Sequence, residues 1–281
     1  MTIAVSAASG QLGRIAVTHL KTLVDPSQVV ALARDPAKLA DLGVTARPFD
    51  YTRPDMLIAG LDGVETLALI SSGDLAGRVD QHRNVIEAAK AAGVGRIVYT
   101  SILKADRSPL MIASDHRATE EILAGAGIAT TILRNNWYSE NRAATLPAAL
   151  GAGALIGAAG QAPFNTATRA DLGQALAIAA ADAALAGAVL ELAGDETYTL
   201  ADLAAEAQRQ SGRDLPYRDL SPEEYQAALL AAGLPAGFAA VLVDADVQAR
   251  DGWMADDSGA LSRLLGRPTT PIADVVAAAL A

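Results

Sequence analysis

The first half of the chain alternates short, almost continuously apolar runs with longer stretches that are apolar on one face only. The apolar runs lie at residues 3–6, 29–33, 67–71, 96–100 and 130–134, with a weaker one at 44–48. Strands of a parallel sheet that is covered on both sides have this composition, and the amphipathic stretches between them supply the covering helices. The pattern predicts an α/β fold with a doubly wound parallel sheet.

The pattern changes after about residue 140. One further strand is predicted at 188–193, and helical periodicity dominates from residue 200. Two of these helices are expected to start at a hydroxyl cap followed by proline, Ser221-Pro222 and Thr270-Pro271. We therefore expect two domains, a sheet domain over residues 1–140 and a smaller, mostly helical lobe over 141–281 that binds the substrate, with a return of the chain to the sheet near 188–193.

Composition and charge narrow the class of protein. The chain has 281 residues, 51% of them hydrophobic, and a formal net charge of −10. An acidic balance disfavours nucleic acid and anionic membranes as partners, because both bind basic surfaces. The chain has no cysteine, which excludes disulfides and thiol chemistry. We see no signal peptide and no apolar run typical of a membrane span, so we expect a cytoplasmic protein. The sequence leaves the oligomeric state open, and a homo-oligomer is compatible with it.

The strongest local motif is SAASGQLG at residues 6–13, which follows the first predicted strand and opens the first predicted helix. A glycine-rich turn in this place is typical of dinucleotide sites, since the backbone approaches the pyrophosphate and the helix N-terminus faces it. The expected cofactor contacts are Ala7, Ala8, Ser9, Gly10, Gln11 and Leu12. Ala7 stands where the pattern has its first glycine, so its side chain strains the turn if its φ is positive. A glycine-rich turn without a ligand is the alternative.

The end of the second predicted strand indicates which dinucleotide is bound. Arg34 lies there, where NADP sites place an arginine for the 2′-phosphate and NAD sites a carboxylate. Lys38 follows one helical turn later and could assist, whereas the adjacent Asp35 weakens the assignment. The prediction is NADPH, and a solvated surface arginine is the alternative.

Together these motifs resemble the NmrA-like group of atypical short-chain dehydrogenases, and within it the bacterial NADPH:quinone oxidoreductases of type 2, with triarylmethane-dye reductases as relatives. The resemblance extends over nearly the whole chain. It includes SGQLG at 9–13, ARDPAK at 33–38, LISS at 69–72, QHRNVIEAAKAAGV at 81–94, YTS at 99–101, LRNNWYSEN at 133–141, IGAAG at 156–160, ATRAD at 167–171, ELAGD at 191–195 and GRPTTP at 266–271. It implies a Rossmann-type fold and an oxidoreductase.

The resemblance also implies further cofactor contacts. The loop after the fourth strand should cover the adenosine and pyrophosphate side, and the segment after the sixth strand should line the nicotinamide side. The residues concerned are Ser71, Ser72 and Gly73 in the first loop and Asn135, Asn136, Trp137, Tyr138, Ser139 and Glu140 in the second. An aromatic hinge between lobes is the alternative for the second segment.

The catalytic chemistry differs from that of typical short-chain dehydrogenases. They use Tyr-x-x-x-Lys to exchange a proton with a carbonyl or alcohol oxygen, and no tyrosine of this chain has lysine four residues later. Reduction of an electron-poor quinone needs less proton assistance and fits this absence. A proton could come from water, from Tyr138, our first candidate for substrate contact, or from His116, for which a structural role on a helix face is the alternative. His19 and His82 are interpreted as ordinary helix residues. No spacing indicates a metal site.

Three functions are therefore weighed. The first is NADPH-dependent hydride transfer to a quinone or a similar conjugated electrophilic acceptor. The second is reduction of cationic dyes, with which the acidic balance is compatible. The third is a redox-sensing regulator of the NmrA type that binds NADP(H) without turnover, which the missing Tyr-x-x-x-Lys also suits.

Overall fold

The computed structural model describes all residues from Met1 to Ala281, and the chain forms two compact units. The first unit contains residues 1–105, 114–135 and 169–191, and the second contains 106–113, 136–168 and 192–281. This division differs from a single boundary at residue 140. The segment 169–191 belongs to the first unit because it forms a helix and a strand of the sheet domain.

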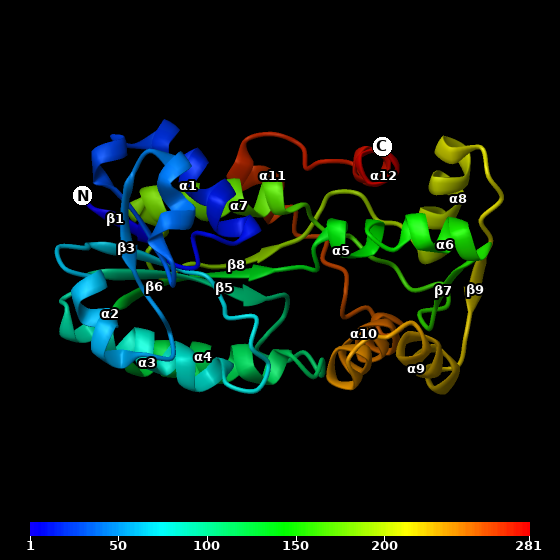
Figure 1. Ribbon diagram of the computed structural model, residues 1–281, viewed down its shortest axis with the longest axis horizontal. Helices are drawn as coiled ribbons and strands as arrows, with labels where there is room; N and C mark the ends of the chain where they lie inside the picture. Colours follow the sequence, from blue (N-terminus) through cyan, green and yellow to red (C-terminus); the bar gives the residue numbers. More distant parts are fainter. The chain divides into compact units, whose positions relative to one another are not determined.

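The first unit is built around a seven-stranded sheet (Figure 1). Its strands are β1 (Ile3–Val5), β2 (Val29–Ala33), β3 (Thr45–Pro48), β4 (Thr66–Leu69), β5 (Arg96–Ile102), β6 (Ala129–Asn135) and β8 (Val189–Leu192). The strand order is β3-β2-β1-β4-β5-β6-β8, and the neighbours from β3 through β6 pair in parallel. The order reverses at β1, which is the arrangement of a dinucleotide-binding Rossmann sheet. The predicted fold class is confirmed.

Helices cover both faces of this sheet (Figure 1). The helical segments of the unit are α1 (Gln11–Leu23), η1 (Pro26–Gln28), η2 (Pro36–Leu42), α2 (Pro54–Gly60), α3 (Arg78–Ala91), α4 (Ala113–Gly125), α7 (Arg169–Ala181) and η3 (Ala183–Leu185). Helices α1 and α7 pack together on one face, and α3 and α4 lie on the other. Gly173 permits the close approach of α7 to α1, because a Cβ there would lie 2.5 Å from Cγ2 of Ile15.

The core of the sheet explains why its strands read as unbroken apolar runs. All residues of β1, β2 and β5 are buried. On the α3 side, the side chains of Leu32 and Leu67 join those of Val85 and Ile86 in one cluster. Burial on both sides removes the polar alternation that a half-exposed strand shows.

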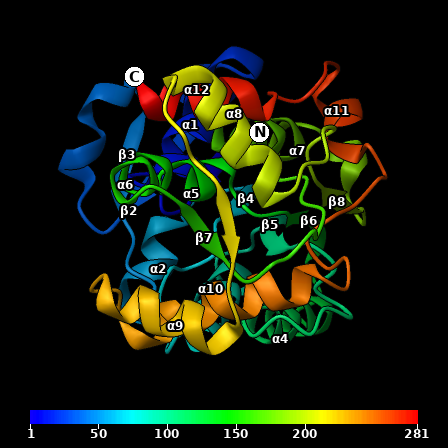
Figure 2. The ribbon, with the colours of Figure 1, turned by 90° about the vertical axis from the view of Figure 1, so that its right-hand side faces the viewer.

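The second unit is mostly helical. Its elements are α5 (Ser139–Ala143), α6 (Leu146–Ala152), β7 (Leu155–Gly157), α8 (Leu200–Ser211), β9 (Tyr217–Asp219), α9 (Pro222–Ala231), α10 (Ala236–Ala249), α11 (Ala260–Leu265) and α12 (Ile272–Leu280). Strands β7 and β9 pair in parallel, and α9 lies beside α10 (Figure 2). Inside this unit the Arg142 guanidinium lies 2.7 Å from the Asp246 carboxylate, and both side chains are buried.

Helix starts in this unit test the predicted caps. Ser221 caps α9 by accepting the Glu224 N–H, and Glu224 bonds back to the Ser221 N–H, as predicted. The prediction of Thr270 as a cap is wrong, since α12 has Pro271 at its N-cap and no side-chain cap. Proline lacks an N–H but takes the extended backbone that an N-cap requires.

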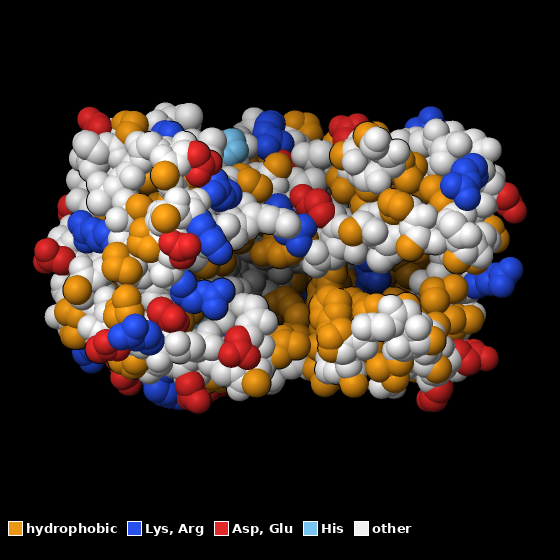
Figure 3. Space-filling model, in the orientation of Figure 1, with side chains coloured by type: hydrophobic (Ala, Val, Ile, Leu, Met, Phe, Trp, Pro, Cys, Tyr) orange, Lys and Arg blue, Asp and Glu red, His pale blue; other side chains and the backbone are white.

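No helix is long and apolar enough to span a bilayer. Acidic and basic side chains are interspersed on the face in Figure 3.

Candidate functional site

The turn between β1 and α1 brings the backbone to the carboxyl edge of the sheet. Ala7 has φ +48°, in the left-handed region, and its carbonyl accepts the Gly10 N–H at 2.9 Å. The Ala8 N–H is bonded to the Leu32 carbonyl at 2.9 Å, and its side chain is buried. Ala8 therefore anchors the turn to β2, and its N–H is not available to a ligand.

Gly13 makes this turn compact. A Cβ at Gly13 would lie 2.5 Å from the Ala7 carbonyl oxygen and 2.7 Å from the Ala8 Cα, distances that real Cβ atoms do not adopt. At Gly10 the same construction meets only the Ala7 oxygen, at 3.3 Å. Gly13, at the third glycine position of the dinucleotide pattern, thus permits the close packing of helix and turn that this position predicts.

Helix α1 starts at this turn with open donors. Gly10 is its N-cap and no side chain caps it, and the first intrahelical bond runs from the Arg14 N–H to the Gly10 carbonyl. The N–H groups of Gln11, Leu12 and Gly13 therefore have no helical acceptor, and together with the helix dipole they form an anion site. Leu12 can contribute only its backbone here, since its side chain is buried in the core, whereas the Gln11 side chain is exposed.

The positive φ of Ala7 gives a direct prediction. A left-handed backbone costs a residue with a Cβ roughly 1–2 kcal/mol, whereas glycine loses about 0.5–1 kcal/mol more chain entropy on folding. We expect Ala7→Gly to raise the free energy of unfolding by about 0.5 kcal/mol in urea titrations. Ala8→Gly, in the same turn without positive φ, is the control and should destabilise. Equal destabilisation by both would contradict the strain at Ala7.

Arg34 stands at the carboxyl end of β2, with its side chain exposed. The neighbouring Asp35 carboxylate accepts the Ala37 N–H at 3.1 Å and caps the short helix η2. The Asp35 carboxylate therefore has a structural role beside Arg34. Lys38 lies on η2 and is exposed.

Four loops at the carboxyl edge line a pocket of about 430 Å³. Its lining residues are Ala7, Ser9, Gly10, Ala33, Arg34, Phe49, Asp50, Tyr51, Thr52, Ser71, Ser72, Gly73, Asp74 and Gln81. The structure thus brings together seven of the residues expected from the sequence: Ala7, Ser9, Gly10, Arg34, Ser71, Ser72 and Gly73. Lys38 does not line this pocket.

The loop after β3 is the part of this pocket that the sequence analysis missed. Asp50 accepts the N–H and the hydroxyl of Thr52, and these bonds hold the pKa of the Asp50 carboxyl below its usual value, with the nearby Arg34 charge as a smaller cause. The Tyr51 hydroxyl bonds to Ser6 Oγ and to the Ile70 carbonyl. The weak strand at 44–48 was the available signal, since ligands bind at the carboxyl ends of all such strands.

The segment 136–140 lies in the second unit, and its polar side chains are engaged there. The Asn136 amide donates to the Asn165 carbonyl at 3.0 Å and the Met254 carbonyl at 3.1 Å, and its oxygen accepts the Trp137 N–H at 2.7 Å. Ser139 Oγ lies 2.8 Å from Thr166 Oγ1. Asn136 and Ser139 are buried, so their contacts favour a structural role.

The other residues of this region differ in exposure. Asn135 ends β6 in the first unit and is buried, and its side-chain oxygen has no hydrogen-bond donor. Trp137, Tyr138 and Glu140 are partly exposed, and Tyr138 is the N-cap of α5. The predicted contacts of Tyr138 with substrate and of these residues with cofactor stay predictions.

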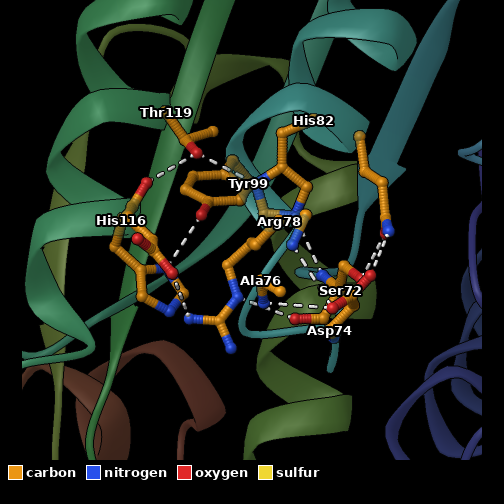
Figure 4. A network of polar contacts seen from close by, with 11 residues as sticks. Ser72, Asp74, Ala76, Arg78, His82, Tyr99, His116 and Thr119 are labelled. Carbon is orange, nitrogen blue, oxygen red and sulfur yellow. Dashed lines mark hydrogen bonds and ion pairs between the residues drawn. The ribbon is translucent and has the colours of Figure 1, made fainter.

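His116 belongs to a buried network between α3, α4 and β5 (Figure 4). Its Nδ1 lies 2.8 Å from the Tyr99 hydroxyl, and burial lowers the pKa of His116 well below its ordinary value, with the Arg78 charge as a smaller cause. A side chain that is 5% exposed and held neutral is poorly suited to deliver a proton to a substrate. The geometry therefore favours the structural alternative for His116.

The sequence analysis interpreted His82 as an ordinary helix residue, but the structure gives it a specific role in a hydrogen-bond network. Its side chain is fully buried, Nε2 accepts the Ser72 N–H at 2.9 Å, and Nδ1 lies 2.9 Å from Thr119 Oγ1. Burial lowers the pKa of His82 to about 3, and the Arg78 charge adds to this effect. The signal for this role was available: Arg78, Gln81 and His82 are spaced to share one face of a helix that follows the Ser71–Gly73 loop.

These lowered pKa values predict acid sensitivity. In the unfolded chain a histidine has a pKa of about 6.5, so it binds a proton below that pH, whereas the same histidine buried in the folded protein stays neutral. The free energy of unfolding therefore falls as the pH drops from about 6.5 toward the pKa of the folded state. Each histidine should contribute a slope of about 1.4 kcal/mol per pH unit between about pH 6.5 and 5, above the range of most carboxylates. Urea unfolding of His82→Gln should show a smaller slope than the unchanged chain. Equal slopes for His82→Gln and the unchanged chain would contradict the prediction.

Comparisons with known proteins agree with this geometry. The model of a family described as NAD(P)H-binding matches residues 7–183. Quinone oxidoreductase 2 of Escherichia coli (strain K12) is 50% identical over 277 residues, which are 98% of this chain and 97% of that protein. The predicted resemblance is confirmed by these matches.

Solved structures give the same result. A crystal structure of the NADPH-dependent quinone oxidoreductase of Escherichia coli complexed with NADPH is 49% identical, with a TM-score of 0.97 and 100% of both chains covered. A crystal structure of the Citrobacter triphenylmethane reductase complexed with NADP(H) is 32% identical, with a TM-score of 0.94, and covers 99% of this chain and 100% of that one.

Proposed function

The chain belongs to the NAD(P)H-binding family, and from this premise we propose that it is an NADPH-dependent oxidoreductase that transfers hydride to a quinone or a similar conjugated acceptor. The observation that carries the proposal is the 50% identity to a quinone oxidoreductase over 98% of the chain. The structure supports it independently, because the pocket of the first unit has the residues that such a cofactor requires.

The residues of the pocket fit a phosphorylated dinucleotide. The open N–H groups of Gln11, Leu12 and Gly13 would bind the pyrophosphate, and Ser9 would add a hydroxyl. Arg34, which lines the pocket at the end of β2, would pair with the 2′-phosphate. The Ser71–Gly73 loop and Asp50 would enclose the adenosine side.

The chemistry of the reduction depends mainly on binding and orientation. NADPH, when bound, supplies the hydride, and a proton from solvent or from a side chain completes the hydroquinone. The chain lacks Tyr-x-x-x-Lys, and the hydroxyl of Tyr99, the nearest tyrosine to a downstream lysine, is buried against His116. The absence of an exposed tyrosine–lysine pair is compatible with reduction of an electron-poor acceptor, because this reaction needs less acid catalysis. We assign the Tyr138 side chain to contact with the acceptor. We also propose that the protein acts in the cytoplasm, as the sequence predicts.

The test is turnover by the purified chain. NADPH is mixed with the protein and 1,4-benzoquinone, and the absorbance of the reduced nicotinamide is followed. We expect the absorbance to fall with added quinone and to stay constant without it. A parallel reaction with a cationic triarylmethane dye separates quinone from dye reduction. Binding of NADPH without oxidation by any acceptor would replace the proposal by the regulator alternative.

A further inference from the structure

Three side chains on one face of α3 bind all three polar groups of Ser72 (Figure 4). His82 Nε2 accepts the Ser72 N–H at 2.9 Å, and the Arg78 Nε–H donates to the Ser72 carbonyl at 2.8 Å. The Ser72 hydroxyl donates to Gln81 Oε1 at 2.6 Å. A loop residue is thus fixed on every hydrogen-bonding group by a helix that begins only six positions later.

The direction of the bonds around His82 is determined by the partners. Thr119 Oγ1 donates to the Asp115 carbonyl at 2.8 Å, so it accepts from His82 Nδ1. Nε2 must carry a lone pair, because it receives the Ser72 N–H. His82 is therefore the neutral tautomer with its proton on Nδ1, and any protonation at Nε2 would place two N–H groups against each other.

The His82 ring is held by its surroundings. Tyr99 packs against it edge to face, with ring centroids 5.4 Å apart and planes at 75°, and Tyr51 lies 6.4 Å away at 69°. Arg78 is also fixed, since its guanidinium lies 3.4 Å from the Asp115 carboxylate of α4 and its side chain is buried. Buried, fully bonded side chains of this kind adopt one geometry.

The fixed residue lies at the pocket. Ser71, Ser72, Gly73 and Asp74 line the pocket, and Gln81 lines it too, donating to the Asp74 carboxylate at 2.7 Å. Glycine and serine loops are mobile unless they are bonded, and a mobile loop loses conformational entropy when a ligand orders it. Bonds that order the loop beforehand remove this cost from binding.

We propose that Arg78, Gln81 and His82 form a positioning face of α3 that pre-orders the Ser71–Asp74 loop for the dinucleotide, with His82 as its central acceptor. The proposal rests on the proposed function only in the identity of the ligand. None of the three side chains reacts with the cofactor, and His82, which is fully buried, acts only through Ser72. We assign the loop to the adenine and pyrophosphate, groups that NADPH and NADH share, so the effect should be the same for both.

The experiment compares His82→Phe, which keeps a ring between the two tyrosines but has no acceptor, with His82→Gln, which restores an acceptor for the Ser72 N–H. Arg83→Gln, on the exposed face of α3, is the control. Nicotinamide fluorescence gives the Kd for NADPH and NADH, and urea unfolding reports the stability. His82→Phe loses the hydrogen bond to the Ser72 N–H, and the loop loses the order that this bond gives it. Both Kd values should therefore rise about five- to tenfold, and His82→Gln should regain most of the affinity.

Two readouts are independent of the cofactor. Hydrogen exchange of the Ser72 amide in the free protein should be slow in the unchanged chain and in His82→Gln, and fast in His82→Phe. Nitrogen resonances of His82 should be those of the neutral Nδ1–H tautomer. Unchanged Kd values in His82→Phe, or a Kd increase that His82→Gln does not reverse, would overturn the proposal.

The proposed function can fail separately. If the unchanged chain binds neither nucleotide, the proposed function and the role toward a dinucleotide are both overturned, even where slow Ser72 exchange shows that the bonds of α3 to the loop exist. If nucleotides bind but no quinone is reduced, only the proposed function fails.

Discussion

Arg34→Ala is expected to weaken NADPH binding by about 10- to 100-fold and to leave NADH binding unchanged, because a charge-assisted bond to phosphate contributes about 1.5–3 kcal/mol. Arg34 lines the pocket from the end of β2, and Asp35, the one carboxylate beside it in the sequence, is bonded to the Ala37 N–H. The 2′-phosphate is the only group that distinguishes NADPH from NADH, so the loss should fall on NADPH alone.

The matched control for Arg34 is Lys38→Ala. Both side chains were assigned to the phosphate from the sequence, but only Arg34 lines the pocket. We expect Lys38→Ala to change the NADPH Kd less than about threefold, the effect of a screened surface charge. Fluorescence titration at two salt concentrations measures both variants. An equal loss in both, or a loss for NADH as well, would contradict the assignment of Arg34.

Gly13→Ala is expected to reduce the free energy of unfolding by about 1–3 kcal/mol, the usual cost of overpacking, and to weaken NADPH binding along with it. The added Cβ would lie 2.5 Å from the Ala7 carbonyl oxygen and 2.7 Å from the Ala8 Cα. Both are backbone atoms, so the turn that carries the anion site must move. A rotation of a side chain cannot relieve the clash.

Gly151→Ala provides the control, because Gly151 lies within α6 and a Cβ there meets nothing within 4 Å. This variant should be more stable by about 0.5–1 kcal/mol, since alanine favours a helix interior. Urea unfolding and NADPH titration measure both variants. If Gly13→Ala were as stable as Gly151→Ala, the close packing of turn and helix would be refuted.

The sheet was predictable from the sequence because its strands are buried on both faces. The apolar runs at 29–33 and 130–134 correspond to β2 (Val29–Ala33) and β6 (Ala129–Asn135). The domain boundary was less accessible, since nothing in the segment 169–191 shows that its helix packs on α1. Only the three-dimensional arrangement reveals that contact.

The site was predictable where its chemistry depends on local motifs. Gly10 and Arg34 follow from the turn and from the strand end, and both line the pocket. The loop at Asp50 was missed because the strand before it is only partly buried and reads weakly. Asn136 was assigned to the cofactor by resemblance, but its amide bonds to Asn165 and Met254, residues far along the chain that no local pattern connects to it.

The role of His82 could not be predicted from the sequence either. Its spacing to Arg78 and Gln81 is visible in the sequence, whereas its acceptor role depends on a loop ten residues earlier and on Thr119 in another helix. Burial, which sets its protonation, is a property of the packed fold.

We propose that the pocket of the first unit binds NADPH in preference to NADH. Titration of the purified chain with NADPH and with NADH, followed by nicotinamide fluorescence, tests this claim most directly. NADPH should bind at least about tenfold more tightly, by the strength of one charge-assisted phosphate contact. Equal affinities, or no binding of either nucleotide, would contradict it.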